Sequence, residues 1–216
     1  MPNSYTEGRH AGEFLLSEAS GTRSRENIVV ASGSGVLPAG SVLGQITVGA
    51  ITASAQAGNT GNGAISAVAA AAGVKPGAYA VIFIEPIANL GTYIVEDPSG
   101  LTVGRGFVGT AFAGGHLAFT ISDGATDFAA GDRFNVAASA GSFEYRPVDP
   151  ANTDGSNIAA AVLYDNIDAT SASVSALGFA RDCEVHGVRL GFKANITVPN
   201  KTLALSQLAA RGIIAR

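Results

Sequence analysis

The sequence predicts a mainly β fold, in which a small β-rich domain with a short C-terminal helix is interrupted by an inserted β-sandwich or barrel. Short runs of β-branched and aromatic residues, roughly 5–8 residues long, recur between turn signals, as they do in sandwiches and barrels. Glycine accounts for 28 of the 216 residues, and each interior helical glycine costs about 1 kcal/mol relative to alanine. Charged residues make up 14% of the chain, too few for a coiled coil or a disordered protein, since soluble domains carry about 25%.

The first 27 residues are polar and irregular. Their apolar cluster is Phe14, Leu15 and Leu16, and several glycines interrupt any helical period. Such a segment buries too little apolar surface to fold alone. It is therefore either a disordered tail or an arm that becomes ordered on a partner, with the three apolar side chains as anchors.

Strands are expected next at residues 28–31 and 42–48, and small residues then form a linker over 53–63. This linker opens a central block that extends to about residue 139. Alanine propensity predicts one helix in the block, at Ala64–Ala72. Alternating or β-branched runs bounded by glycine and Asp-Gly turns predict its strands, at residues 78–84, 92–95, 103–112, 116–121 and 133–136.

After residue 141 the sequence again resembles residues 28–52 in composition. Strands are expected at 143–145, 158–164, 173–181 and 184–192. Leu203, Leu205 and Leu208 are spaced for a short helix over 201–211, and Gly212 suits the position that ends it. We therefore predict an arm at 1–27, a discontinuous domain at 28–52 and 141–216, and an inserted β-domain at 53–140.

Charge and hydropathy exclude several partners. The net charge is −4 and no run of Lys or Arg occurs, so a nucleic-acid footprint is not expected. The longest apolar stretch, Ala64–Val74, is too short to span a bilayer. The N-terminus lacks a signal-peptide pattern, which predicts a protein that is not exported by a cleaved signal. The single cysteine, Cys183, excludes an internal disulfide and a cysteine-based zinc site.

No catalytic or cofactor site emerges from the motifs. Residues 104–109 match G-x-G-x-x-G, but no helix is expected after them, as a dinucleotide site requires. Asp123, Asp127 and Asp132 lack the alternating spacing of a calcium loop, so we expect turn capping, with an adventitious cation site as the alternative. The three histidines are far apart. Carboxylates beside Cys183 would raise its pKa, which is unfavourable for a nucleophile. We predict no enzyme and no cofactor.

Several runs resemble the head decoration proteins of lambda-type tailed bacteriophages. Near the N-terminus they are GEFLLSEA at 12–19, GTRSRE at 21–26 and AGSVLG at 39–44. Near the C-terminus they are residues 154–155, 161–163, 181–185 and 208–216. Their order and spacing fit the family once residues from about 53 to 140 are removed.

The resemblance implies a protein that binds the outer surface of the expanded phage head as trimers, at threefold and local threefold positions, and cements it. The implied partners are the major capsid protein and further copies of this chain. The implied location is the outer surface of the virion, after synthesis in the host cytoplasm. It also implies that the N-terminal arm orders on the major capsid protein, which assigns capsid binding to Arg9, Glu13, Phe14, Leu15, Leu16, Ser17, Arg23, Arg25 and Glu26.

The central block is a departure from the compact family members. We expect it to project away from the shell or toward a neighbouring subunit. The alternative function is a surface module in which this block recognises host glycans. That would need exposed aromatic side chains, although strand periodicity predicts that most of them face the core; the available set is Tyr79, Tyr93, Phe107, Phe112 and Phe128.

Overall fold

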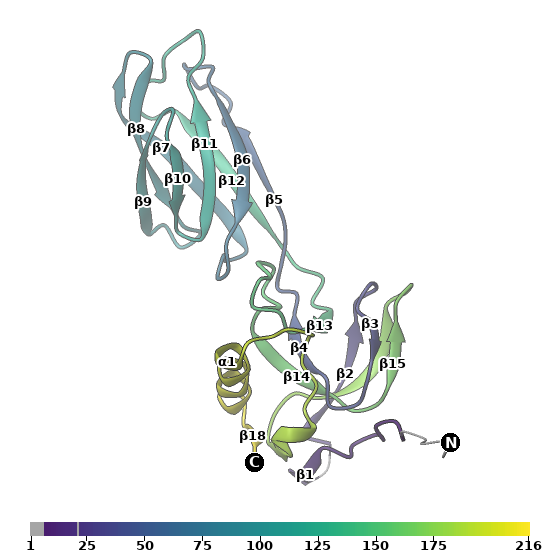
Figure 1. The fold of residues 1–216 in the computed structure, drawn as a ribbon. Helices are drawn as coiled ribbons and strands as arrows, with labels where there is room; N and C mark the ends of the chain where they lie inside the picture. The colour runs from purple at the N-terminus through teal and green to yellow at the C-terminus, as the bar shows by residue number, and fades with distance from the viewer. Residues whose placement is uncertain (1–6, 21) are drawn as a thin grey trace. The chain divides into compact units, whose positions relative to one another are not determined.

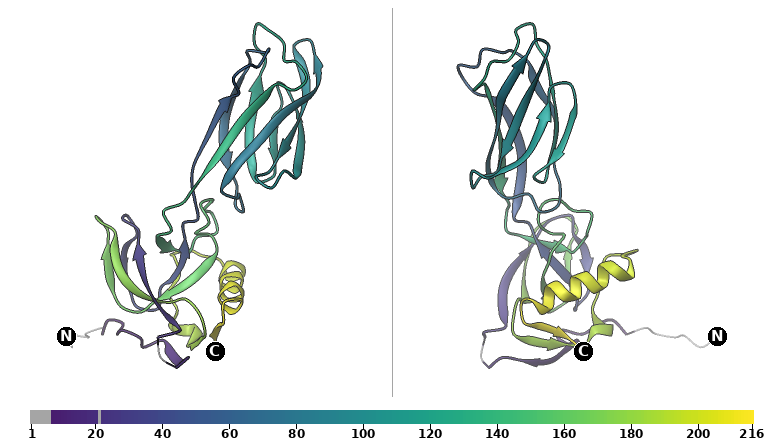
Figure 2. Two further views of the ribbon diagram at one scale, coloured as in Figure 1. Left: turned by 180° about the vertical axis from the view of Figure 1, so that it is seen from behind. Right: turned by 90° about the vertical axis from the view of Figure 1, so that its left-hand side faces the viewer.

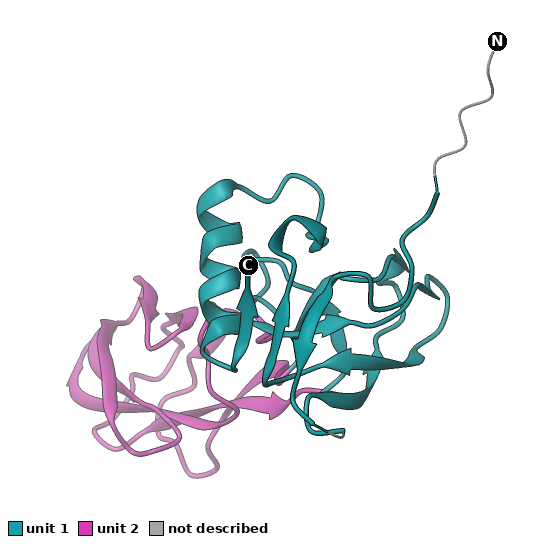
Figure 3. Ribbon diagram, turned by 90° about the horizontal axis from the view of Figure 1, so that it is seen from below, with its two compact units in different colours: residues 1–46, 143–152, 156–216 teal, residues 47–142, 153–155 magenta. Residues whose placement is uncertain are grey.

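The computed structural model describes residues 7–20 and 22–216, and its described part is mainly β with a short C-terminal helix. The mainly β prediction is confirmed. Contacts divide the chain into two compact units (Figure 3). Unit 1 comprises the described residues up to Ile46, together with 143–152 and 156–216, and unit 2 comprises 47–142 and 153–155.

Unit 1 is built around a closed five-stranded barrel with the strand order β13-β2-β16-β14-β4 (Figure 1). Beside it lie a three-stranded sheet, β1-β17-β18, and a two-stranded ribbon, β15-β3. The strands are β1 (Leu15–Glu18), β2 (Arg25–Val30), β3 (Gly35–Leu37), β4 (Val42–Gln45), β13 (Tyr145–Pro147), β14 (Ala159–Leu163), β15 (Ile167–Ala169), β16 (Val174–Phe179), β17 (Cys183–Val185) and β18 (Ile213–Ala215), with a 3-10 turn at Gly187–Arg189.

The helix α1 (Val198–Ala209) covers one side of unit 1. It begins earlier than the sequence predicted, because Thr197 caps it: the Thr197 hydroxyl accepts a hydrogen bond from the Asn200 N–H. It ends before Gly212, whose positive φ of 78° suits a helix terminus. Leu208 is fully buried against β14 and β18, whereas Leu203 remains half-exposed.

Unit 2 is a β-sandwich of a five-stranded sheet, β5-β12-β7-β8-β9, and a three-stranded sheet, β10-β11-β6 (Figure 2). Aromatic rings from both sheets fill the space between them. Tyr93 lies 5.9 Å from Phe119, and Phe119 stacks on Phe112 at 4.8 Å between ring centroids. The strands are β5 (Val48–Ala55), β6 (Ala64–Ala70), β7 (Gly77–Ile87), β8 (Leu90–Glu96), β9 (Thr102–Phe107), β10 (Ala111–Gly114), β11 (Leu117–Ser122) and β12 (Arg133–Ala140).

The helix predicted at Ala64–Ala72 is wrong, because this segment forms β6. It pairs antiparallel with β11, and a register shift near Ala67 accommodates one extra residue. The shift lets both Ile65 and Val68 pack on the sandwich core. Alanine's helix preference is worth less than 1 kcal/mol per residue over most residue types, and this sheet pairing overrides it.

The segment predicted as a linker is structured. Its first residues belong to β5, and the following loop is fixed to the start of β12 by two side chains. The Asn59 amide donates to the Arg133 carbonyl and accepts from the Arg133 N–H. The buried Asp132 carboxylate accepts from the N–H groups of Thr60 at 2.9 Å and Gly61 at 2.8 Å. It also accepts from Ala129 at 2.9 Å.

Candidate capsid-docking segment

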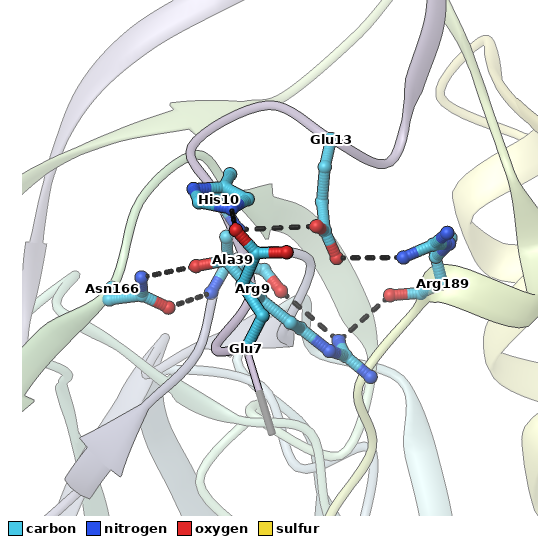
Figure 4. Close-up of polar contacts among 7 residues, drawn as sticks. All are labelled: Glu7, Arg9, His10, Glu13, Ala39, Asn166 and Arg189. Atoms are coloured by element: carbon cyan, nitrogen blue, oxygen red, sulfur yellow. Dashed lines mark hydrogen bonds and ion pairs between the residues drawn. The ribbon is translucent and has the colours of Figure 1, made fainter. Parts of the chain in front are cut away.

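Polar contacts hold the start of the described chain against unit 1 (Figure 4). The Arg9 guanidinium donates to the carbonyl oxygens of Ala39 at 3.1 Å and Arg189 at 2.8 Å. The Asn166 amide completes the arrangement, donating to the Arg9 carbonyl at 2.6 Å and accepting from the Ala39 N–H at 2.9 Å. The segment around Arg9 is therefore tied to three separate parts of unit 1, at Ala39, Asn166 and Arg189.

Glu13 is the acidic centre of the same group. Its carboxylate accepts a hydrogen bond from the His10 N–H at 3.2 Å and forms an ion pair with Arg189 at 3.3 Å. The His10 hydrogen bond, supported by the Arg189 charge, lowers the pKa of Glu13 although partial burial opposes this. Glu13 is therefore held ionised and oriented toward unit 1.

Phe14 lies inside the unit 1 core with no exposed surface. Its ring meets Phe179 edge-on at 5.8 Å between centroids, and its carbonyl accepts a 2.7 Å hydrogen bond from the His186 N–H. Leu15 packs partly buried against the same cluster. Phe14 thus anchors the segment to its own domain.

Strand β1 pairs antiparallel with β17, so that Ser17 lies opposite Glu184. The register shifts between Leu15 and Ser17, and Leu16 at this bulge is 52% exposed. The Ser17 hydroxyl donates to the Glu184 carboxylate at 3.1 Å. Because the order of the sheet is β1-β17-β18, β1 is an edge strand, and edge strands present unpaired backbone groups.

Three ion pairs follow at the junction of β1 and β2. The guanidinium of Arg25 binds Glu18 at 2.5 Å and lowers the pKa of that carboxyl. Arg23 pairs with Asp182 at 2.7 Å, and Glu26 pairs with Arg181. Arg25 also lies 5.2 Å from the centre of the Tyr164 ring and 5.4 Å from that of Phe179, a cation–π arrangement.

All nine residues predicted to bind the capsid therefore lie in one segment of unit 1, but that segment is packed rather than free. Phe14 in particular is an interior residue and not an exposed anchor. Residues 1–6 and Gly21 of the predicted arm lie outside the described residues. The partners Asp182 and Glu184 were missed, although the family-like run at 181–185 contains both.

Cys183 is buried between β1 and β18. Burial, reinforced by the charges of Glu18 and Asp182, raises the pKa of its thiol to about 11. We expect native protein to react with a thiol reagent at pH 8 at least tenfold more slowly than protein unfolded in urea, because only the thiolate is nucleophilic. Equal rates in the two conditions would contradict the packing of β1 on β17.

The remaining motifs have structural roles. The G-x-G-x-x-G match spans β9 and the turn into β10, where Gly104 and Gly106 pack against aromatic rings. The Asp127 carboxylate accepts from the Asn89 N–H at 2.8 Å, and Asp132 binds three backbone N–H groups. Within residues 7–20 and 22–216, no group of three or more His, Cys, Asp or Glu side chains is arranged to hold a metal ion.

Four of the five aromatic side chains considered for glycan recognition are buried, as strand periodicity predicted, and Phe107 alone of the set is exposed. Within this set, Phe107 is therefore the one ring available to stack on a sugar. Among the residues that the structure describes, no helix has the length and apolarity needed to cross a membrane.

Solved structures with some likeness to this chain are flagellar proteins. FlgL from Xanthomonas campestris is 27% identical over 47% of this chain and 33% of its own, with a TM-score of 0.35. The flagellar hook junction protein FlgK from Burkholderia pseudomallei is 26% identical over 63% of this chain and 23% of its own, with a TM-score of 0.34. The chain spans about a third or less of these proteins. TM-scores this low carry no argument about fold or function.

No curated protein matches the chain. A family model does: that of the bacteriophage lambda head decoration protein D matches residues 4–85 and 112–213. The match covers most of the chain and includes parts of unit 2 on both sides of its unmatched residues, so it does not set unit 2 apart as an addition to the family domain. The chain belongs to the bacteriophage lambda head decoration protein D family, a family of structural proteins of the phage capsid.

Proposed function

We propose that this protein binds the outer surface of the expanded phage head as homotrimers at threefold and local threefold positions, and cements the shell through β1. Family membership gives a structural role, binding to the capsid and a location in the virion. The observation that supports the finer proposal is the position of β1 at the edge of its sheet, with Leu16 exposed on it.

An edge strand can receive an extended segment of another protein, because its outer N–H and C=O groups have no strand partner. In this proposal the major capsid protein supplies that segment. Phe14 fixes the strand from within unit 1, and the ion pairs of Arg23, Arg25 and Glu26 fix its far end. The strand is therefore already ordered before docking, which reduces the conformational entropy lost on binding.

Cementing follows from multivalency. A trimer that presents three β1 edges to three capsid sites converts the second and third binding events into intramolecular ones, which raises the overall affinity by a factor of about 10²–10⁴. Each individual contact then needs only modest strength. The shell becomes stabilised because three neighbouring capsid subunits are held by one rigid trimer.

The test is co-sedimentation with expanded heads assembled from the major capsid protein of the same phage. We expect the wild-type chain to pellet at saturation near one copy per capsid subunit. The variant Leu16→Glu places a charge on the exposed strand without disturbing the core, and we expect its affinity to fall at least tenfold. Val198→Glu, on an exposed position of α1, is the matched control and should bind as the wild type does.

Equal binding of the two variants would exclude β1 as the docking edge. A wild-type chain that does not pellet would overturn the cementing role itself. Deleting residues 1–27 is a poor substitute for these point variants, because the deletion also removes Phe14 from the core of unit 1.

A further inference from the structure

Unit 2 carries an apolar patch on the outer face of its five-stranded sheet. Tyr93 and Phe83 point into the sandwich, so the residues that alternate with them face outward. A register shift between Phe83 and Glu85 brings Glu85 and Ile87 to the outer face as well, because Glu85 pairs with Thr92 and Ile87 with Leu90. Strand register pairs Ile87 with Leu90 and Ile82 with Ile94, and Phe107 lies beside Thr92 in the row between these two pairs. The patch consists of Ile82, Ile87, Leu90, Ile94 and Phe107.

Three side chains of this patch are exposed, Ile82 and Ile94 are partly buried, and the whole is built on a fixed platform. Ile87 is 55% exposed, Leu90 54% and Phe107 53%. The turn between Ile87 and Leu90 is held by the hydrogen bond from the Asn89 N–H to the Asp127 carboxylate. Exposed apolar side chains gathered on one face in this way mark interaction surfaces.

The charges across the patch suit a second copy of the same surface. Glu85 and Arg105 form an ion pair that crosses β8 on this face, and both side chains are more than half exposed. Beyond them the same face carries Glu96 and Arg133, again one acid and one base. The face is therefore neutral, which disfavours a strongly charged partner.

A two-fold contact between identical surfaces brings residue i opposite residue j and residue j opposite residue i. Around such an axis, Glu85 of each copy meets Arg105 of the other, and the apolar side chains on either side of this ion pair also meet. We propose that unit 2 makes this homotypic contact between copies from neighbouring trimers on the phage shell. The proposal rests on the capsid-binding function given above.

The size of the patch explains why the contact needs the shell. Stable protein interfaces use about 20–30 residues on each side, and this patch supplies far fewer. Free copies therefore associate through it only weakly, at high protein concentration. On a shell, each copy is already fixed beside its neighbours, and the high effective concentration makes a small contact sufficient. The expected consequence is cooperative decoration.

Charge reversal with mixing tests the contact directly. Glu85→Arg leaves two cations on every patch, and Arg105→Glu leaves two anions, so either variant alone meets only like charges. An equal mixture of the two restores opposite charges across the axis, and so does the double variant E85R/R105E. Both substituted side chains, Glu85 and Arg105, are more than half exposed, so folding should be unaffected, which circular dichroism checks.

Binding isotherms on expanded heads provide the readout. We expect a Hill coefficient above 1 for the wild type, near 1 for each single variant, and above 1 again for the mixture and the double variant. Non-cooperative binding by the wild type, or cooperative binding by the single variants, would overturn the inference while leaving the cementing role intact. Recovery in the double variant without recovery in the mixture would also overturn it, since the two charges would then act within one copy.

If the wild type does not bind heads, the cementing proposal fails, and sedimentation equilibrium of the free chains decides the contact separately. At the highest soluble concentration, we expect the mixture to show a larger average mass than either single variant. Equal average masses would overturn the homotypic contact.

Discussion

Replacing Phe14 with Ala is expected to destabilise unit 1 by about 3–5 kcal/mol, the usual range for removing a buried aromatic side chain. The ring is completely enclosed and contacts Phe179 within the cluster that also contains Leu208 and Ile213. The loss should release β1 from β17, because Phe14 directly precedes that strand. The measurement is denaturant unfolding followed by circular dichroism.

Leu16→Ala is the matched control, two residues away and half-exposed. We expect it to change the free energy of unfolding by less than about 0.5 kcal/mol, as surface substitutions usually do. If Phe14→Ala were equally mild, the N-terminal segment would not be packed in solution, and the free-arm prediction would be restored.

Replacing Asp132 with Ala is expected to destabilise unit 2 by about 3 kcal/mol, since hydrogen bonds to a charged group contribute about 1.5–3 kcal/mol each and part of the loss is recovered by hydration. Three backbone N–H groups lose their acceptor in this variant. The loop around Gly61 should then detach from β12. Asp127→Ala, which removes one hydrogen bond from an exposed carboxylate, should have a clearly smaller effect.

The effect of Asp132 should depend on pH. Burial opposes its ionisation, but the hydrogen bonds from Ala129, Gly61 and Thr60 together lower its pKa below the ordinary value. A lowered pKa stabilises the folded state above the unfolded pKa of about 3.9, and that stabilisation is lost as the pH falls through the folded pKa. The difference between wild type and Asp132→Ala should be constant above about pH 5 and shrink below pH 4. A constant difference down to pH 2 would contradict this role.

Strand periodicity was sufficient to predict most of the sandwich. Tyr79, Val81 and Phe83 alternate with less buried residues, and the structure buries all three. The alternation in β11 predicted that strand equally well. Periodicity failed at β6, where a bulge breaks the alternation and alanine gives no directional signal. Local sequence contains no information about the partner strand β11, which supplies the hydrogen bonds.

The candidate docking segment was predictable as a set of residues but not as a structure. Its polar composition indicated that it needs a partner to become ordered. The partner turned out to lie in the same chain, since β17 and the loop at Arg189 receive it. Ser17 and Glu184 are 167 positions apart, and no local pattern connects residues across such a distance.

The same separation determines when unit 1 can fold during synthesis. Strand β1 emerges from the ribosome early, but β17 and β18 are made near the end of the described chain. Unit 2 is almost continuous in sequence, so it can fold while translation continues, as domains generally do. Phe14 meanwhile has no core to enter. The polar residues that surround Phe14 in the sequence keep this segment soluble until β17 and β18 have been synthesised.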